Sequence, residues 1–132
     1  MLISVALFGL VHLFLIPQIT VTGLLAILVG GLLFTAAYIC TRRLWFSSSL
    51  HATLDFTQDA IFGVGTSHLS GVAAVGLLSA QLSGPAALTG GAFGIEGSVP
   101  TLAVLLAAVV ALLVWAERHG RLVAPAWRRG QP

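Results

Sequence analysis

The stretch VTGLLAILVGGLLFTAAYICT, residues 21–41, decides the fold, because it is apolar and long enough to cross a bilayer as one helix. It belongs to a longer segment, residues 1–41, that holds no charged side chain, and it is followed by Arg42 and Arg43. Glycines and alanines are scattered through it, and such small residues let helices approach closely in lipid. The stretch therefore predicts a transmembrane helix packed against neighbouring helices.

The composition of the whole chain indicates the same class of protein. Of its 132 residues, 58% are hydrophobic and only 8% are charged, whereas a soluble domain carries about a quarter charged residues. So few charges cannot cover a water-facing surface, so we predict an integral membrane protein whose main partner is the lipid bilayer. The arginines gather beside apolar runs, which is the pattern of cytosolic membrane ends and not of a nucleic-acid site, so no nucleic-acid partner is expected: Arg42, Arg43, Arg118, Arg121, Arg128 and Arg129.

Working outward from residues 21–41, we predict an all-α, multi-span transmembrane bundle. About four spans are expected, near residues 2–16, 21–41, 45–62 and 99–115. Pro17 stops the first span, and Ser98 with Pro100 marks the start of the last. Residues 1–117 are expected to form one transmembrane domain, and residues 118–132 a basic cytosolic tail.

The segment of residues 63–97 has a different texture, rich in glycine, serine and threonine, and is predicted to be an extracytosolic loop. Its apolar stretch, residues 72–82, is too short to span a bilayer and predicts a re-entrant or interfacial helix. The arginine clusters place the loop outside and the ends of the second and last spans inside. Cys40, the only cysteine, excludes an intrachain disulfide and is expected to be a small buried thiol, with acylation as the alternative.

Ionisable residues inside the apolar spans are the candidate functional residues. His12 lies in the first span, and His51 is followed one helical turn later by Asp55, with Asp59 or Gln58 continuing the same polar stripe. Such groups are costly at membrane depth and usually face a protein interior or a wet cavity. Two imidazoles and a carboxyl suit hydrolysis, in which water is activated and an oxyanion is stabilised, and they can also bind a divalent metal such as zinc.

Less specific interpretations apply to the other candidates. A single buried histidine is more often a structural hydrogen-bonding group than a catalyst. His68 lies in a polar loop and is expected to be solvated, and His119 is expected to be an interfacial residue of the tail. Glu96 lies in a glycine-rich loop just before a helix N-terminus, where a solvated acid is the expected role and entry into the site is the alternative.

These residues resemble the motifs of the CPBP family, which comprises CAAX-processing membrane endopeptidases and bacteriocin-immunity proteins of the Abi type. Phe8-Gly-Leu-Val-His12 is similar to the Phe-x-x-x-His motif of that family, and His51-Ala-Thr-Leu-Asp55 to its later His-x-x-x-Asn/Asp motif. Residues 89–98, TGGAFGIEGS, are similar to a loop before the last helix of many bacterial members. The resemblance implies an all-helical membrane bundle that hydrolyses peptide bonds in a bacterial-type inner (plasma) membrane, with His12, His51 and Asp55 at the active site.

Two departures from the family pattern limit what the resemblance implies. The family has an earlier Glu-Glu-x-x-x-Arg motif that supplies the water-activating glutamate, and no Glu-Glu pair occurs in this sequence. The chain is therefore expected to be the C-terminal part of the pattern, truncated and weakly active or inactive without its general base. Asp55 also stands where the peptidases usually have Asn, so it would orient His51, bind a metal or carry a proton, since an ionised carboxylate donates no hydrogen bond.

Two functions from different classes follow. The first is a membrane endopeptidase, a hydrolase acting on membrane-proximal peptides, in which His12 holds water or a metal, His51 stabilises the oxyanion or binds the same metal, and Asp55 supports His51. The alternative is a non-catalytic membrane protein of the same family, either a bacteriocin-immunity factor or a partner-binding scaffold. A transporter subunit for protons or metal ions is a weaker third possibility, because a pathway needs polar groups at several depths.

Overall fold

The computed structural model describes residues 1–16, 19–64 and 76–123, and all regular elements within these ranges are helical. The all-α prediction is therefore confirmed for the described residues. Four longer helical segments form the body of the fold, α1 (Leu2–Leu15), α2 (Val21–Thr41), α3 (Leu44–Phe56) with its π-helical continuation η1 (Thr57–Phe62), and α5 (Val99–Arg118). Three short elements precede α5: α4 (Ala86–Thr89), η2 (Gly91–Phe93) and η3 (Ile95–Gly97).

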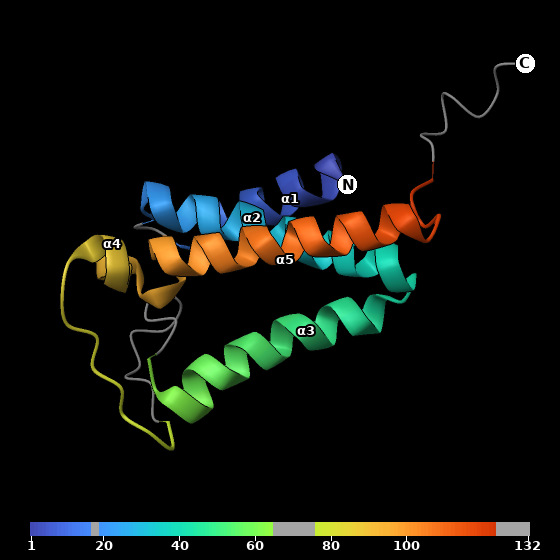
Figure 1. The fold of residues 1–132 in the computed structure, drawn as a ribbon. Coiled ribbons are helices and arrows are strands. Elements are labelled where there is room, and N and C mark those ends of the chain that lie inside the picture. The colour runs from blue at the N-terminus through green and yellow to red at the C-terminus, as the bar shows by residue number, and fades with distance from the viewer. Residues whose placement is uncertain (17–18, 65–75, 124–132) are drawn as a thin grey trace, which may run out of the picture.

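Helix α2 is the centre of the bundle, with α1 and α5 packed against it (Figure 1). Ala36 and Ala37 of α2 are completely buried. A Cβ added at Gly31 would lie only 3.2 Å from the ring of Phe8 on α1, so the absence of a side chain lets this aromatic ring approach the α2 backbone. The predicted role of the small residues, close approach of neighbouring helices, is therefore confirmed.

Helix α5 runs in the same direction as α2, and the two helices end on the same side of the molecule (Figure 1). Val29 and Leu33 of α2 pack with Val109 of α5 in a buried cluster. The thiol of Cys40 is buried and donates to the carbonyl oxygen of Leu112 at 3.3 Å, so the expectation of a small buried thiol is confirmed. These contacts fix α5 lengthwise along α2.

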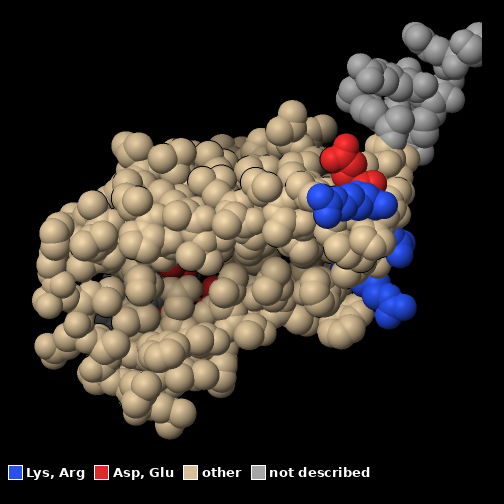
Figure 2. Space-filling view, viewed as in Figure 1, with Lys and Arg blue, Asp and Glu red and all other residues tan. Residues whose placement is uncertain are grey.

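The side on which α2 and α5 end carries the described arginines, which gather at one tip of the molecule (Figure 2). A guanidinium nitrogen of Arg42, Nη2, donates to the carbonyl oxygen of Arg121 at 2.7 Å and joins the two helix ends. The described cations therefore lie together, as the positive-inside pattern requires. Arg128 and Arg129 lie outside the described residues.

Helix α3 leaves this tip and runs back beside α2, diverging from the bundle toward its far end (Figure 1). The hydroxyl of Ser47 donates to the carbonyl oxygen of Phe34 at 2.8 Å and ties the start of α3 to α2. Residues 45–62 were expected to form one regular helix, but α3 changes to the wider π-helix η1 at Thr57. The hydroxyl of Thr57 bonds to the carbonyl oxygen of Thr53 at 2.7 Å, a side-chain contact of the kind that competes with regular helical pairing.

The chain between η1 and α5 corrects one prediction. Residues 72–82 were expected to form a short helix, but residues 76–82 are not helical, and residues 72–75 lie outside the described ranges. The amides of Leu77 and Leu78 instead donate to the carbonyl oxygens of Ala60 and Ile61 at 2.9 and 2.8 Å. The end of a π-helix leaves carbonyl groups without partners, and this extended segment satisfies them more directly than a separate helix would.

Two of the helices, α2 and α5, are long and apolar enough to cross a membrane, while α1 is a shorter apolar helix. The start signal predicted for α5 is present, because the hydroxyl of Ser98 accepts a hydrogen bond from the amide of Thr101 at 3.2 Å, with Pro100 in the first turn. The pattern predicted α2 over residues 21–41, and α2 spans Val21–Thr41.

Candidate functional site

A cavity of about 270 Å³ opens between α1, α2, α3, η1 and the segment that leads into α5. Its apolar wall comes mainly from α2, including Ile27, Leu33 and Phe34. Its polar groups come from the other elements, and the space-filling view shows acidic atoms deep in a hollow of the surface (Figure 2). They are His12, His51, Asp55, Gln58, Asp59, Glu96 and Thr101.

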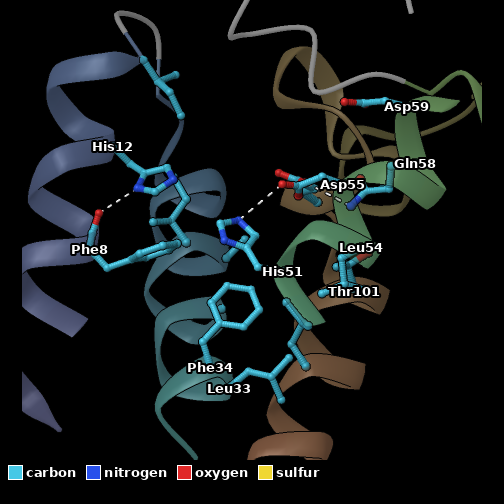
Figure 3. Close-up of a pocket in the computed structure, with 16 residues that line it drawn as sticks. Phe8, His12, Leu33, Phe34, His51, Leu54, Asp55, Gln58, Asp59 and Thr101 are labelled. Atoms are coloured by element: carbon cyan, nitrogen blue, oxygen red, sulfur yellow. Dashed lines mark hydrogen bonds and ion pairs between the residues drawn. The ribbon is translucent and has the colours of Figure 1, made fainter. Parts of the chain in front are cut away.

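His12 reaches the cavity from α1 (Figure 3). Its Nδ1 lies 2.7 Å from the carbonyl oxygen of Phe8, one turn earlier on the same helix. A carbonyl oxygen only accepts, so Nδ1 carries the hydrogen of this bond, and in the neutral ring Nε2 remains an acceptor. The rings of Phe8 and His12 also lie in contact, with centroids 4.3 Å apart. The Phe-x-x-x-His spacing therefore fixes both the orientation and the tautomer of the imidazole.

His51 reaches the same cavity from α3, where its Nε2 lies 3.5 Å from an Asp55 oxygen, Oδ2 (Figure 3). The ring of His51 lies against Phe34 of α2, with centroids 4.5 Å apart. The side chains of His51 and Asp55 are 40% and 49% exposed, respectively. The pair is therefore held by its helical spacing and by Phe34, and the cavity is open on the α3 side.

The structure brings His12, His51 and Asp55 to one cavity, as the sequence predicts. The ring of Phe8 lies between the two imidazoles, because its centroid is also 5.7 Å from the centroid of the His51 ring. No group of three or more His, Cys, Asp or Glu side chains able to hold a metal occurs within the described ranges. The divalent metal offered as an alternative for these three residues therefore stays a prediction, and no step is derived through a metal.

The polar stripe of α3 extends into η1. Asp59 and Gln58 were predicted as alternatives for the last residue of this stripe. In the structure both side chains line the cavity. Both residues belong to the π-helix η1, Thr57–Phe62. Such π-turns are frequently found at functional sites.

Glu96 corrects the sequence analysis, which predicted a solvated loop acid. Its side chain lines the cavity, and its Oε1 accepts a hydrogen bond from the side-chain amide of Gln58, Nε2, at 3.1 Å. Burial raises the pKa of Glu96 above its ordinary value, the hydrogen bond from Gln58 lowers the pKa, and the charges of Asp55 and Asp59 raise it. One signal in the sequence was available, because Glu96 is the only charged residue between Asp59 and Glu117.

A second, shallower cavity of about 470 Å³ adjoins the first one and shares Phe8, Phe34 and His51 with it. Hydroxyl groups enrich its lining, and they come from α1, α2 and α3: Ser4, Thr35, Tyr38, Ser47 and Ser48. His51 therefore borders both cavities: the first has an apolar wall and carboxyl groups, and the second is a groove with several hydroxyl groups.

Two histidines were not expected to take part in the site. His119 lies outside the cavity, where its ring stacks on Trp115 with centroids 4.2 Å apart, beside the end of α5. Its Nδ1 lies 2.8 Å from the carbonyl oxygen of Trp115. His68 lies outside the described residues, and its predicted solvation stays a prediction.

Comparison with known proteins gives a family match to part of the chain. Residues 1–57 match the family described as type II CAAX prenyl endopeptidase Rce1-like. The matched segment includes His12, His51 and Asp55, and it ends before Glu96. The match supports the CPBP assignment that the two histidine motifs predicted. No curated protein and no solved structure matches the chain.

Proposed function

We propose that this chain, as a relative of the type II CAAX endopeptidases, forms the catalytic cavity of a membrane-embedded peptide-bond hydrolase. The observation that carries the proposal is the convergence of His12 and the His51–Asp55 pair on one cavity from two different helices. Each of these groups costs free energy in a membrane, and a common reaction space gives them a shared reason to be there.

The geometry supports distinct roles for the two imidazoles. His12 has Nδ1 committed to the carbonyl oxygen of Phe8, so Nε2 can hold a water molecule or accept a proton. His51 lies with Nε2 beside Asp55, and in the protonated ring Nδ1 is a second donor that can bind a carbonyl oxygen as it becomes an oxyanion. Asp55 keeps the ring in this orientation, which is the role left to a carboxylate at a position where the family usually has Asn.

The adjoining groove fits an extended peptide as substrate. The hydroxyl groups of Ser4, Tyr38 and Ser48 can donate to and accept from a peptide backbone, and the groove leads to His51. The hydroxyls of Thr35 and Ser47 donate to the carbonyl oxygens of Gly31 and Phe34, so they can serve the substrate only as acceptors. We therefore propose a membrane-proximal peptide as the substrate class. Lipid modification of the substrate forms no part of the proposal.

The proposed setting is a bacterial-type inner membrane with four spanning segments, formed by α1, α2, α3 continued by η1, and α5. The arginine-bearing tip where α2 and α5 end is then cytosolic. The loop between η1 and α5 faces the other side. Labelling of single cysteines introduced at exposed positions, Trp45 and Leu88, tests this topology, since the two sites must react from opposite sides of the membrane.

The decisive experiment is cleavage of a membrane-tethered reporter peptide by the purified chain in liposomes, with His51→Ala compared to Phe56→Ala. Phe56 lies on the same helix, is 61% exposed and does not line the cavity. We expect His51→Ala to reduce kcat/KM at least about 100-fold, the usual lower range for losing acid–base or oxyanion assistance, and Phe56→Ala to retain activity. A chelator should leave the rate unchanged.

Other results would overturn the proposal. Equal cleavage by the wild-type chain and by His51→Ala would remove the assigned role of the cavity. A wild-type chain that binds a partner or protects against a toxin without cleaving any reporter would instead establish the non-catalytic alternative, and protection that survives His51→Ala would identify a scaffold.

A further inference from the structure

Glu96 is held in the wall of the cavity because residues next to it in the sequence contact α2 and α5. The ring of Phe93, which is 2% exposed, packs with Ile27 of α2 in a buried cluster and lies against the backbone at Gly23. The hydroxyl of Thr101 on α5 donates to the carbonyl oxygen of Ile95 at 2.8 Å. These two anchors fix the short turn η3, and with it Glu96, between α2 and the start of α5.

The Glu96 carboxyl meets the polar residues of η1 across the cavity. Gln58 donates to its Oε1 at 3.1 Å, and both side chains line the same cavity as His12 and His51. The carboxyl therefore comes from a third direction, distinct from the α1 wall of His12 and the α3 wall of His51. A reacting group in the cavity would be surrounded by two imidazoles and this carboxyl.

We propose that Glu96 is the general base of this cavity, accepting a proton from the water that attacks the peptide bond. The inference deepens the proposed function and rests on it. Among the other two carboxyls in the cavity, Asp55 already lies beside the Nε2 of His51, where it orients the ring. Asp59 follows Gln58 on η1 and lines the cavity from the same element as Gln58, whereas Glu96 comes from the separate turn η3.

The proposed reaction balances without any further reactant. Glu96 removes a proton from water while the water oxygen bonds to the carbonyl carbon, and the carbonyl π electrons move to oxygen, giving a tetrahedral oxyanion held by His51. The C–N bond then breaks as the carbonyl reforms, and the proton on Glu96 passes to the departing nitrogen. The products are a carboxylic acid and an amine, and Glu96 returns to its ionised form.

The environment of Glu96 suits a proton acceptor. Burial raises its pKa, Gln58 lowers it, and the charges of Asp55 and Asp59 raise it, so the carboxyl is more basic than an ordinary glutamate. A base is most effective when its pKa approaches the working pH. The other ionisable side chains on the cavity walls are His51 on α3 and His12 on α1, and α2 and α5 contribute none to the lining.

The first test replaces Glu96 by its uncharged isostere, Glu96→Gln, with Glu117→Gln as the matched control. Glu117 is exposed near the end of α5 and does not line the cavity. We expect Glu96→Gln to reduce kcat roughly 10²–10⁴-fold with KM nearly unchanged, and Glu117→Gln to behave as wild type. At a pH above the raised pKa of Glu96, the melting temperature of Glu96→Gln should equal or exceed that of wild type. A carboxyl whose pKa is raised by folding stabilises the folded protein less as the pH rises through that pKa, and the uncharged glutamine avoids this loss.

The second test uses the pH dependence of kcat/KM and does not require the Glu96 variant to fold. Gln58→Met removes the hydrogen bond that favours the carboxylate, so the acidic limb of the profile should move to higher pH. Asp59→Asn removes a like charge, so that limb should move to lower pH. Opposite displacements identify Glu96 as the group that titrates, whereas a merely structural role predicts no displacement in either variant.

The outcomes separate this inference from the proposed function. Loss of cleavage in His51→Ala together with unchanged kcat in Glu96→Gln would overturn the role of Glu96 and leave the hydrolase standing. A wild-type chain without hydrolytic activity would overturn both. Unmoved pH profiles in the Gln58 and Asp59 variants would also overturn the inference, whatever the activity of Glu96→Gln.

Discussion

Helix α2 and the α3–η1 segment both come from apolar stretches of the sequence, yet they differ in how many of their residues are buried. Helix α2 buries residues along its length, from Gly23 to Cys40, and contacts α1, α3 and α5. Neither α3 nor η1 buries a single residue, and their polar side chains line the cavity. The described buried residues are thus concentrated in α2, whereas α3 and η1 contribute most of the polar side chains that line the cavity. Substitutions in α2 should therefore change stability, and substitutions facing the cavity should change activity.

The largest effect is expected at His12, which faces the cavity from α1. His12→Ala should lower kcat/KM at least about 100-fold, because the imidazole that holds the water is lost. The melting temperature should change little, because His12 is only partly buried and its one described hydrogen bond is local. Reporter cleavage and thermal unfolding measured on the same preparation check both statements. Leu15→Ala, an exposed position of the same helix, is the control. A large drop in melting temperature would mean that His12 belongs to the packing region.

The next effect contrasts an apolar truncation in each region. Leu33→Ala in α2 should lower the free energy of unfolding by about 2–5 kcal/mol, since the side chain is buried against Val29 and Val109 and its loss leaves a cavity. Phe56→Ala in α3 should change it by less than about 0.5 kcal/mol, since that ring is exposed. Unfolding in mixed micelles measures both values, and similar losses would contradict the division between the two segments.

A smaller effect is expected where α2 receives the ring of Phe93. A Cβ at Gly23 would clash with that ring, so Gly23→Ala should cost about 1–3 kcal/mol and displace the turn that holds Glu96. Gly30→Ala is the matched control, because its added Cβ would make only an ordinary contact with Phe34 at 3.9 Å. The free energy of unfolding should fall in the first variant only; Gly30 lines the cavity, so this control is compared by unfolding and not by activity. Equal free energies of unfolding in the two glycine variants would show that the contact between Phe93 and Gly23 does not position the loop.

The smallest effect concerns the start of α5. Ser98→Ala removes the side-chain oxygen that caps the helix and should cost about 1 kcal/mol. Ser48→Ala, at an exposed position of α3, should cost almost nothing. The difference in melting temperature between the two serine variants measures how much the Ser98 cap stabilises the protein. A difference near zero would show that the cap does not help to hold η3.

The parts of the fold that follow from local pattern were predictable. Residues 21–41 matched α2 because an apolar run bounded by arginines has few alternatives in lipid. The start of α5 was predictable for the same local reason, a serine followed by proline in the first turn. The pairing of His51 with Asp55 was predictable from spacing, because helical periodicity places residues four apart on one face. Their assignment, with His12, to an active site stays a prediction.

The other features of the fold and of the cavity depend on contacts between residues that are distant in the sequence, and no periodic pattern marks such contacts. The placement of Glu96 results from Phe93 fitting over Gly23, a contact between residues seventy positions apart in the chain, and no local rule predicts it. The short helix expected at residues 72–82 failed for a related reason, because the carbonyl groups at the end of η1 take the amides of Leu77 and Leu78. The change from α-helix to π-helix at Thr57 was also missed, since both forms share the same apolar composition.

The π-turn at Thr57–Phe62 has a consequence for comparing this chain with its relatives. A π-turn inside an α-helix holds one residue more than the turn it replaces, so a homologue lacking it will be one residue shorter within the helix itself. A sequence alignment that allows gaps only in loops would then shift positions 58–62 of this turn, until a gap in the following loop restores the register. The glutamine and aspartate of this turn would be paired with the wrong columns, and a conserved partner of Glu96 would look like a variable surface position.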